Sequence, residues 1–154
     1  MKIFIMRHGE AEHFADSDAA RQLTPRGRVE SEAVARACKE QGFAQFDKVL
    51  VSPYIRAQQT WQEISAYFSA KSIETCEDIT PYGQSEHVFD FASALIEVEQ
   101  LDSLLFVSHL PLVGYLTSEF VKDMTPPMFP TSGLVCIEYD LQTQNGEVLW
   151  HITP

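Results

Sequence analysis

The 154-residue sequence has few cysteines, and their pattern does not suit cross-linking. The three are far apart, odd in number and without a CxxC pair: Cys38, Cys76 and Cys136. This pattern argues against a disulfide framework and against a zinc site, and it fits buried thiols in a reducing compartment. We therefore expect neither a disulfide nor a metal site, and a chain of this length can fold without such cross-links.

Basic residues and long apolar runs are also scarce. Lysine and arginine number 11 against 22 aspartate and glutamate, which gives a formal net charge of −11. Nucleic acids and anionic membrane surfaces bind positive patches, so this balance argues against both as main partners. The N-terminal apolar run Ile3 to Met6 is too short for a signal peptide, and no stretch approaches a membrane span. These absences predict a cytoplasmic protein.

The sequence does contain strand-length apolar runs that alternate with longer segments of helical period, a pattern typical of an α/β layered domain. No linker interrupts it, so we expect one domain over residues 1–154. A three-layer sandwich is expected, with a mostly parallel sheet of about six strands, helices on both faces and no large cap insertion. The predicted strands are Lys2–Arg7, Lys48–Ser52, Ser72–Cys76, Ser103–Ser108, Leu134–Tyr139 and Val148–Ile152.

The connections between these strands complete the expected fold. The last two strands are joined by a short segment with the turn signal Asn145-Gly146, so they should pair antiparallel at one end of the sheet. Four helices are predicted between the other strands. The spacing of Val29, Ala33 and Ala37 marks the expected buried face of the first helix. The helix starts are expected at a Thr24 cap with Pro25, at a Ser52 cap with Pro53, near Ser85, and at Pro111.

Three of the predicted strands end in residues suited to holding a phosphate. In open α/β sheets, ligands bind beyond the carboxyl ends of the strands, where helix N-termini attract anions. Guanidinium groups match pairs of phosphate oxygens, and a glycine lets the backbone approach closely. One such arginine or histidine is usually a surface or capping residue, but several together predict an anion site. The strand ends are Arg7-His8-Gly9, Ser52-Pro53 with Arg56 shortly after, and Ser108-His109.

These segments resemble the motifs of the histidine phosphatase superfamily, which includes the cofactor-dependent phosphoglycerate mutases. Residues 6–9 (MRHG) are similar to its RHG signature, and residues 52–60 (SPYIRAQQT) to its SPxxRAxQT motif. Residues 107–109 (VSH) are similar to the segment with its late histidine. The SixA-type phosphohistidine phosphatases are a closer match still, at residues 4–11, 108–116 and 125–129. The blocks follow in order from residue 3 to about 132, so the resemblance covers nearly the whole chain.

The resemblance implies a role for each matching residue. His8 would be the nucleophile that takes the phosphoryl group and forms a covalent phosphohistidine. Arg7, Gly9, Arg56 and His109 would surround the phosphate and stabilise its charge. Phosphoryl transfer of this kind needs mostly positioning and electrostatics, so no metal and no cofactor is expected. His8 must be neutral to attack, and we expect the nearby guanidinium groups and partial burial to lower its pKa.

The acid that protonates the leaving group stays open. Asp78, with Glu77 beside it, follows the predicted third strand, and Asp18 lies in the loop after the RHG signature. Each also has an interpretation as a solvated loop carboxylate. An imidazole leaving group has a second ring nitrogen that solvent can protonate, so a phosphohistidine phosphatase tolerates a missing acid better than a phosphomonoesterase does. The ambiguity thus favours phosphohistidine as substrate.

Chain length supports the same substrate class. The predicted third strand and third helix use most of the residues between Trp61 and Val107, which leaves little for a lid. An open pocket suits a phosphorylated side chain on another protein, such as the histidine phosphotransfer domain of a two-component relay, with inorganic phosphate as product. Two alternatives stay open: a small-molecule phosphomonoesterase of the same superfamily, and a non-catalytic phosphate-binding module. The Pro-rich stretch Met124 to Ser132 is expected to be a rigid loop, part of the pocket rim or a docking surface.

Overall fold

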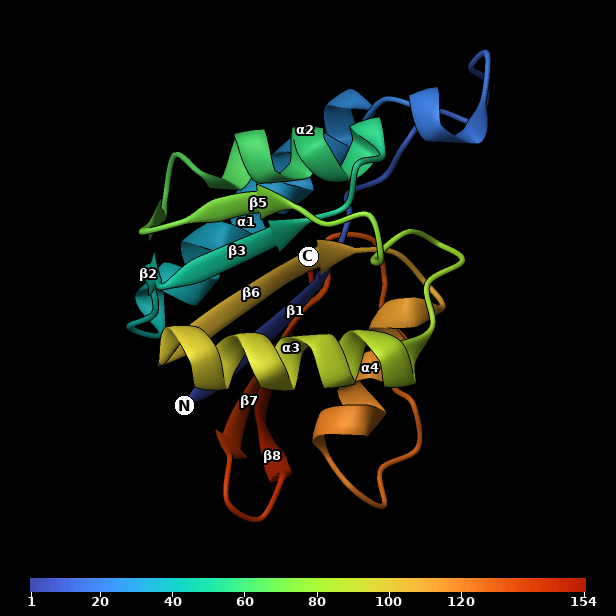
Figure 1. Ribbon diagram of the computed structural model, residues 1–154. Coiled ribbons are helices and arrows are strands. Elements are labelled where there is room, and N and C mark those ends of the chain that lie inside the picture. Colours follow the sequence, from blue (N-terminus) through green and yellow to red (C-terminus); the bar gives the residue numbers. More distant parts are fainter.

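A six-stranded sheet forms the centre of the protein (Figure 1), in a computed structural model that describes residues 1–154. The strand order is β5-β3-β6-β1-β7-β8. Strands β5, β3, β6 and β1 run parallel, and β7 pairs antiparallel with both β1 and β8. The expected mostly parallel sheet with an antiparallel edge is thus confirmed. The strands are β1 (Lys2–Arg7), β3 (Lys48–Val51), β5 (Ile73–Thr75), β6 (Ser103–Ser108), β7 (Leu134–Asp140) and β8 (Asn145–Ile152).

Helices cover both faces of the sheet, as expected, with α1 and α2 on one face and α3 and α4 on the other (Figure 1). The predicted cap of α1 is confirmed, since the Thr24 side chain accepts a hydrogen bond from the Gly27 N–H. A short 3-10 helix and a separate parallel ladder, both too short to leave a periodic pattern, were not expected. These elements are α1 (Pro25–Glu40), α2 (Ile55–Ile64), α3 (Ser85–Glu99), α4 (Leu112–Phe120), the 3-10 helix (Asp18–Ala20), and the ladder of β2 (Gln45–Phe46) with β4 (Ser69–Ala70).

The start of α2 differs from the prediction. The helix begins at Ile55, and its cap position is occupied by Tyr54, two residues after the expected cap Ser52. The Ser52 hydroxyl instead accepts the Tyr54 N–H at 3.2 Å, which closes a tight turn between β3 and the helix. Helix α4 also starts one residue late, at Leu112, with Pro111 in the cap position.

The predicted buried face of α1 was wrong. Val29 is 65% exposed, and the helix turns a face of mostly small residues inward: Gly27, Ser31, Val34, Ala35 and Cys38. Close approach explains this choice, because a Cβ on Gly27 would collide with the carbonyl oxygen of Glu10. Helix α1 therefore packs directly onto the chain that follows β1, and this constraint outweighs the weak apolar periodicity of the sequence.

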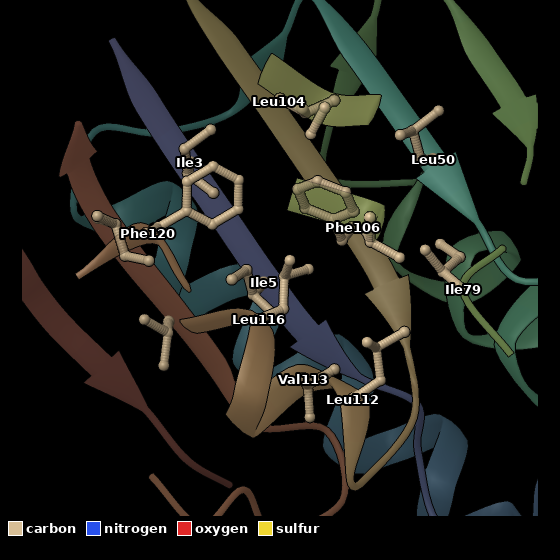
Figure 2. Packing of buried hydrophobic residues seen from close by; sticks show 14 of the residues in the cluster. Ile3, Ile5, Leu50, Ile79, Leu104, Phe106, Leu112, Val113, Leu116 and Phe120 are labelled. Atoms are coloured by element: carbon tan, nitrogen blue, oxygen red, sulfur yellow. The ribbon is translucent and has the colours of Figure 1, made fainter. Parts of the chain in front are cut away.

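Two apolar clusters, one on each face of the sheet, form the core. Successive residues of a buried strand point to opposite faces, so Ile3 and Ile5 join the cluster under α3 and α4, while Phe4 and Met6 join the one under α1 and α2. Figure 2 shows the first cluster, where Phe106 and its neighbours on β6 and β1 meet side chains of α4. All three cysteines are buried and unpaired, as expected. None of the helices combines the length and apolar content needed to cross a bilayer.

A matched pair of substitutions tests the observed face of α1. Val34→Ala should lower the free energy of unfolding by about 2 kcal/mol, because it removes two buried methyl groups and leaves a cavity. Val29→Ala should change it by less than about 0.5 kcal/mol, because that side chain is exposed. Urea denaturation of both variants measures the difference, and equal losses would contradict the orientation of the helix.

Candidate active site

Three neighbouring strands bring the predicted site residues to one edge of the sheet. Strand β6 lies between β1 and β3 and pairs in parallel with both. Its register places Ser108 opposite Arg7. The residues that directly follow the two strands, His109 and His8, therefore lie side by side, with ring centroids 5.0 Å apart. Arg56 reaches the same place from the first turn of α2, and its Nε lies 3.2 Å from Nε2 of His8. All four predicted side chains therefore gather at one site.

The imidazole of His8 is held in one tautomer. Its Nδ1 lies 2.7 Å from the carbonyl oxygen of Gly9, which can only accept a hydrogen bond. The proton therefore sits on Nδ1, and Nε2 carries the lone pair that accepts the Arg56 Nε–H. The Gly9 N–H donates to Thr60 Oγ1 at 2.9 Å, and this hydrogen bond holds the Gly9 backbone in place. Nε2 is thus the ring nitrogen that carries the lone pair.

Burial keeps both histidines neutral. Burial of the ring away from solvent lowers the pKa of His8 to about 3, and the positive charges of Arg56 and Arg7 act in the same direction. The hydrogen bond to Gly9 favours the protonated ring but does not outweigh burial. Burial likewise lowers the pKa of His109 to about 2, with further contributions from its neighbours. At neutral pH the site therefore combines positive guanidinium groups with two uncharged imidazoles.

His109 is oriented by the turn that precedes α2. Its Nε2 lies 2.7 Å from the Ser52 hydroxyl, which already accepts the Tyr54 N–H. If the hydroxyl donates its own proton to Nε2, every group of Ser52 is paired and the imidazole proton lies on Nδ1. The opposite assignment would leave the hydroxyl proton without an acceptor. The Ser52 side chain, expected as a helix cap, instead sets the tautomer of the second histidine.

Two donors at this site are buried without a partner in the protein. They are Nδ1 of His109 and Nε of Arg7, whose Nη1 donates to the Phe129 carbonyl oxygen at 2.8 Å. Buried donors are nearly always paired in folded proteins, because an unpaired one costs about 1–3 kcal/mol. Oxygens of a phosphoryl group on His8 would supply acceptors for both.

Asp18 and Arg21 are part of the site through Arg56. The two Nη atoms of Arg56 donate to Asp18, to its carbonyl oxygen at 2.7 Å and to its Oδ2 at 3.3 Å. Oδ1 of Asp18 accepts from Arg21 Nη1 at 3.0 Å, and Arg21 Nε donates to the Glu12 carbonyl oxygen at 2.6 Å. The guanidinium of Arg56 also lies 5.1 Å from the Tyr54 ring centroid. Asp18 therefore fixes two arginines at once.

A cavity of about 300 Å³ opens at His8. Arg7, Arg21 and Thr131 line it together with His8. Thr131 belongs to the Pro-rich stretch, so part of that stretch lines the pocket, in agreement with one of the three alternatives expected for it. Arg21 was not predicted as a site residue, because it stands in no motif. The fold of the loop before α1 brings it to the cavity.

The two candidate acids lie in different surroundings. Partial burial works to raise the pKa of Asp18, but the hydrogen bonds and charges of Arg21 and Arg56 outweigh it, and the net shift is downward. Asp18 is therefore ionised at neutral pH and better suited to holding Arg56 than to giving a proton. Asp78 is half-exposed, lies 3.6 Å from Nε2 of His87, and does not line the cavity that contains His8.

Comparison with known proteins assigns the family. The model of the histidine phosphatase superfamily (branch 1) matches residues 3–87, more than half of the chain. The chain belongs to this superfamily. It is 41% identical over 155 residues to the phosphohistidine phosphatase SixA of Escherichia coli K12, covering 100% of this chain and 94% of that protein. The SixA homolog of Haemophilus influenzae is 37% identical over 158 residues, covering 98% of this chain and 94% of that protein.

A solved structure agrees with this assignment. The protein histidine phosphatase SixA complexed with tungstate superimposes with a TM-score of 0.93 at 41% identity. The match covers 100% of this chain and 97% of that one. The six-stranded sheet and the absence of a large insertion are therefore shared with this histidine phosphatase over the full length.

The protonation state of His8 can be measured directly. In ¹⁵N NMR spectra of the ring nitrogens, His8 should remain neutral with its proton on Nδ1 from pH 8 down to pH 5, because its pKa lies near 3. A histidine in water titrates near pH 6.5, so the two cases are separated by more than three pH units. Protonation of His8 near pH 6.5 would contradict the burial and the hydrogen bonds described above.

The role of Asp18 can be separated from that of an acid. Asp18→Ala should lower kcat/KM by roughly tenfold to a hundredfold, because Arg56 loses a restraint. The loss should be equal for p-nitrophenyl phosphate and for phenyl phosphate, whose leaving group is the poorer one. A larger loss with phenyl phosphate would instead assign proton donation to Asp18. Asp78→Ala, the matched variant of the other candidate acid, should change neither rate.

Proposed function

We propose that residues 1–154 form one phosphohistidine phosphatase domain that hydrolyses phosphohistidine on a protein without a metal ion. The proposed substrate is the histidine phosphotransfer domain of a two-component relay. The observation that carries the proposal is the state of His8, which is neutral, with its Nε2 lone pair between Arg56 and His109. The 41% identity to E. coli SixA over the full chain supports the substrate class.

The proposed reaction has two displacements at phosphorus. In the first, the Nε2 lone pair of His8 forms a bond to phosphorus as the bond to the substrate imidazole breaks. For this, Arg56 moves its Nε–H from Nε2 to a phosphoryl oxygen and so frees the lone pair, and Arg7 and His109 bind the other oxygens. The His8 ring becomes a positively charged phosphoimidazolium, and the Gly9 carbonyl oxygen stabilises it through the Nδ1–H. In the second displacement, water attacks phosphorus, and phosphate and neutral His8 are released.

The leaving group explains why a strong acid is dispensable in this proposal. Substrate imidazole that departs with the bonding electrons takes a proton from solvent, directly or through its second nitrogen. An alkoxide has no such second position and needs an acid in the pocket. Asp18 is held ionised by two arginines, so the site suits phosphohistidine better than a phosphomonoester.

A cytoplasmic setting is part of the same proposal. Three buried free thiols suit a reducing compartment, and relay phosphotransfer proteins are encountered there. The net charge of −11 argues against nucleic acid and anionic membranes as main partners.

Phosphate release from a phosphohistidine-bearing phosphotransfer domain tests the function. Wild type should release phosphate without added metal, and His8→Ala should reduce the rate to background. A quenched reaction of wild type should contain a labelled phosphoenzyme that is absent from the variant. The matched control His87→Ala, at an exposed histidine, should retain full activity.

Two other results would change the conclusion. If His8-dependent hydrolysis is found with small phosphomonoesters but not with the phosphoprotein, the enzyme is a small-molecule phosphatase. If phosphate binds but nothing is hydrolysed, the site is a binding module.

A further inference from the structure

The loop between β1 and α1 places apolar side chains in solvent. Phe14 is 93% exposed, and Ile55 at the start of α2 is 37% exposed. Both line a hollow of about 440 Å³ that we call the Phe14 hollow. Its residues are mostly apolar with a few polar ones: Phe14, Ala15, Ala20, Leu23, Ile55, Glu12, Asp16 and Gln22. Exposure of a whole aromatic side chain beside an apolar hollow points to contact with another molecule.

The Phe14 hollow is continuous with the catalytic cavity. Glu12 lines both. A smaller depression between them shares His13 and Arg21 with the catalytic cavity and Ala15 with the hollow. In Figure 1 the loop, drawn in blue, projects at the end of the molecule where β1, β3 and β6 terminate. The Phe14 hollow therefore lies next to the cavity that a substrate protein must reach in order to bring a phosphoryl group to His8.

Charge is divided between the floor and the rim of this surface. The guanidinium groups of Arg7 and Arg21 line the catalytic cavity, and Arg56 lies buried beside His8. The exposed rim carries carboxylates instead, with Glu12 and Asp16 at the hollow and Glu10 at the catalytic cavity. A small free anion meets repulsion at this rim. A protein that surrounds its phosphohistidine with lysine or arginine meets attraction.

We propose that the Phe14 hollow is the docking site for the protein that carries the phosphohistidine. The partner places an apolar side chain against Phe14 and Ile55, and it places basic side chains against Glu12 and Asp16. This inference rests on the proposed function and adds the surface that selects the phosphoprotein over small phosphorylated compounds. Aromatic side chains that become buried on association often dominate the affinity of an interface.

Two substrates measured side by side test the proposal. Phe14→Ser should raise KM for the phosphorylated phosphotransfer domain by roughly tenfold, equal to about 1.4 kcal/mol. KM and kcat for phosphoramidate, a small compound with a P–N bond, should stay within about twofold of wild type. The matched control Val98→Ser changes an 81% exposed side chain on α3, which covers the face of the sheet opposite to α1 and α2, and should alter neither substrate.

A charge variant tests the basic contacts. Asp16→Lys should raise KM for the phosphoprotein, and the increase should shrink at high ionic strength because the interaction is screened. Circular dichroism spectra identical to wild type would show that both exposed variants fold.

Each contrary result has a distinct meaning. An unchanged KM for the phosphoprotein in Phe14→Ser overturns the docking site and leaves the proposed function standing. An equal rise in KM for phosphoramidate also overturns docking, because the hollow then belongs to a small ligand. A wild-type enzyme that dimerises through the hollow, shown by monomeric Phe14→Ser in analytical ultracentrifugation, assigns it to a second copy instead. Failure of wild type to hydrolyse the phosphoprotein overturns the function and the docking site together.

Discussion

The parallel pairing of β1 and β3 with β6 is the constraint on which the site depends. Parallel strands end at the same edge of a sheet, and three adjacent ends here deliver His8, Ser52 and His109 to one place. The pairing is stable because these strands are apolar on both faces and are covered by helices on both sides. The reacting groups are therefore fixed by the core of the protein rather than by mobile loops.

Burial at that edge controls the protonation of the two histidines. It holds both imidazoles neutral although guanidinium groups lie beside them, and it makes each hydrogen bond stronger than it would be in water. The same burial leaves one donor of Arg7 and one of His109 without a hydrogen-bond partner in the protein. Groups of this kind are rare in folded proteins, and here they match the acceptors of a phosphoryl group. The site is thus incomplete until the substrate is bound, which favours binding of phosphate oxygens.

The acidic surface and the basic floor act on different molecules. Arg7 and Arg21, which line the cavity, attract a phosphoryl group once it is inside. In the proposed docking mode, the carboxylates around it repel small anions and attract a protein with basic side chains. A strongly acidic phosphatase can therefore act on an anionic group, provided that the group arrives on a partner of suitable surface charge.

Sequence patterns alone predicted most of the fold and the group of side chains that the fold brings together at the candidate site. Strand-length apolar runs predicted the sheet, because residues buried on both faces must be apolar, and the histidines and arginines at strand ends predicted a phosphate site. Tertiary structure alone decided which face of α1 is buried, since close approach at Gly27 overrides apolar periodicity. It also decided the roles of Ser52, Asp18 and Arg21, which act through contacts between segments distant in the chain. Side chains that work by such contacts carry no local pattern, so only the folded chain reveals them.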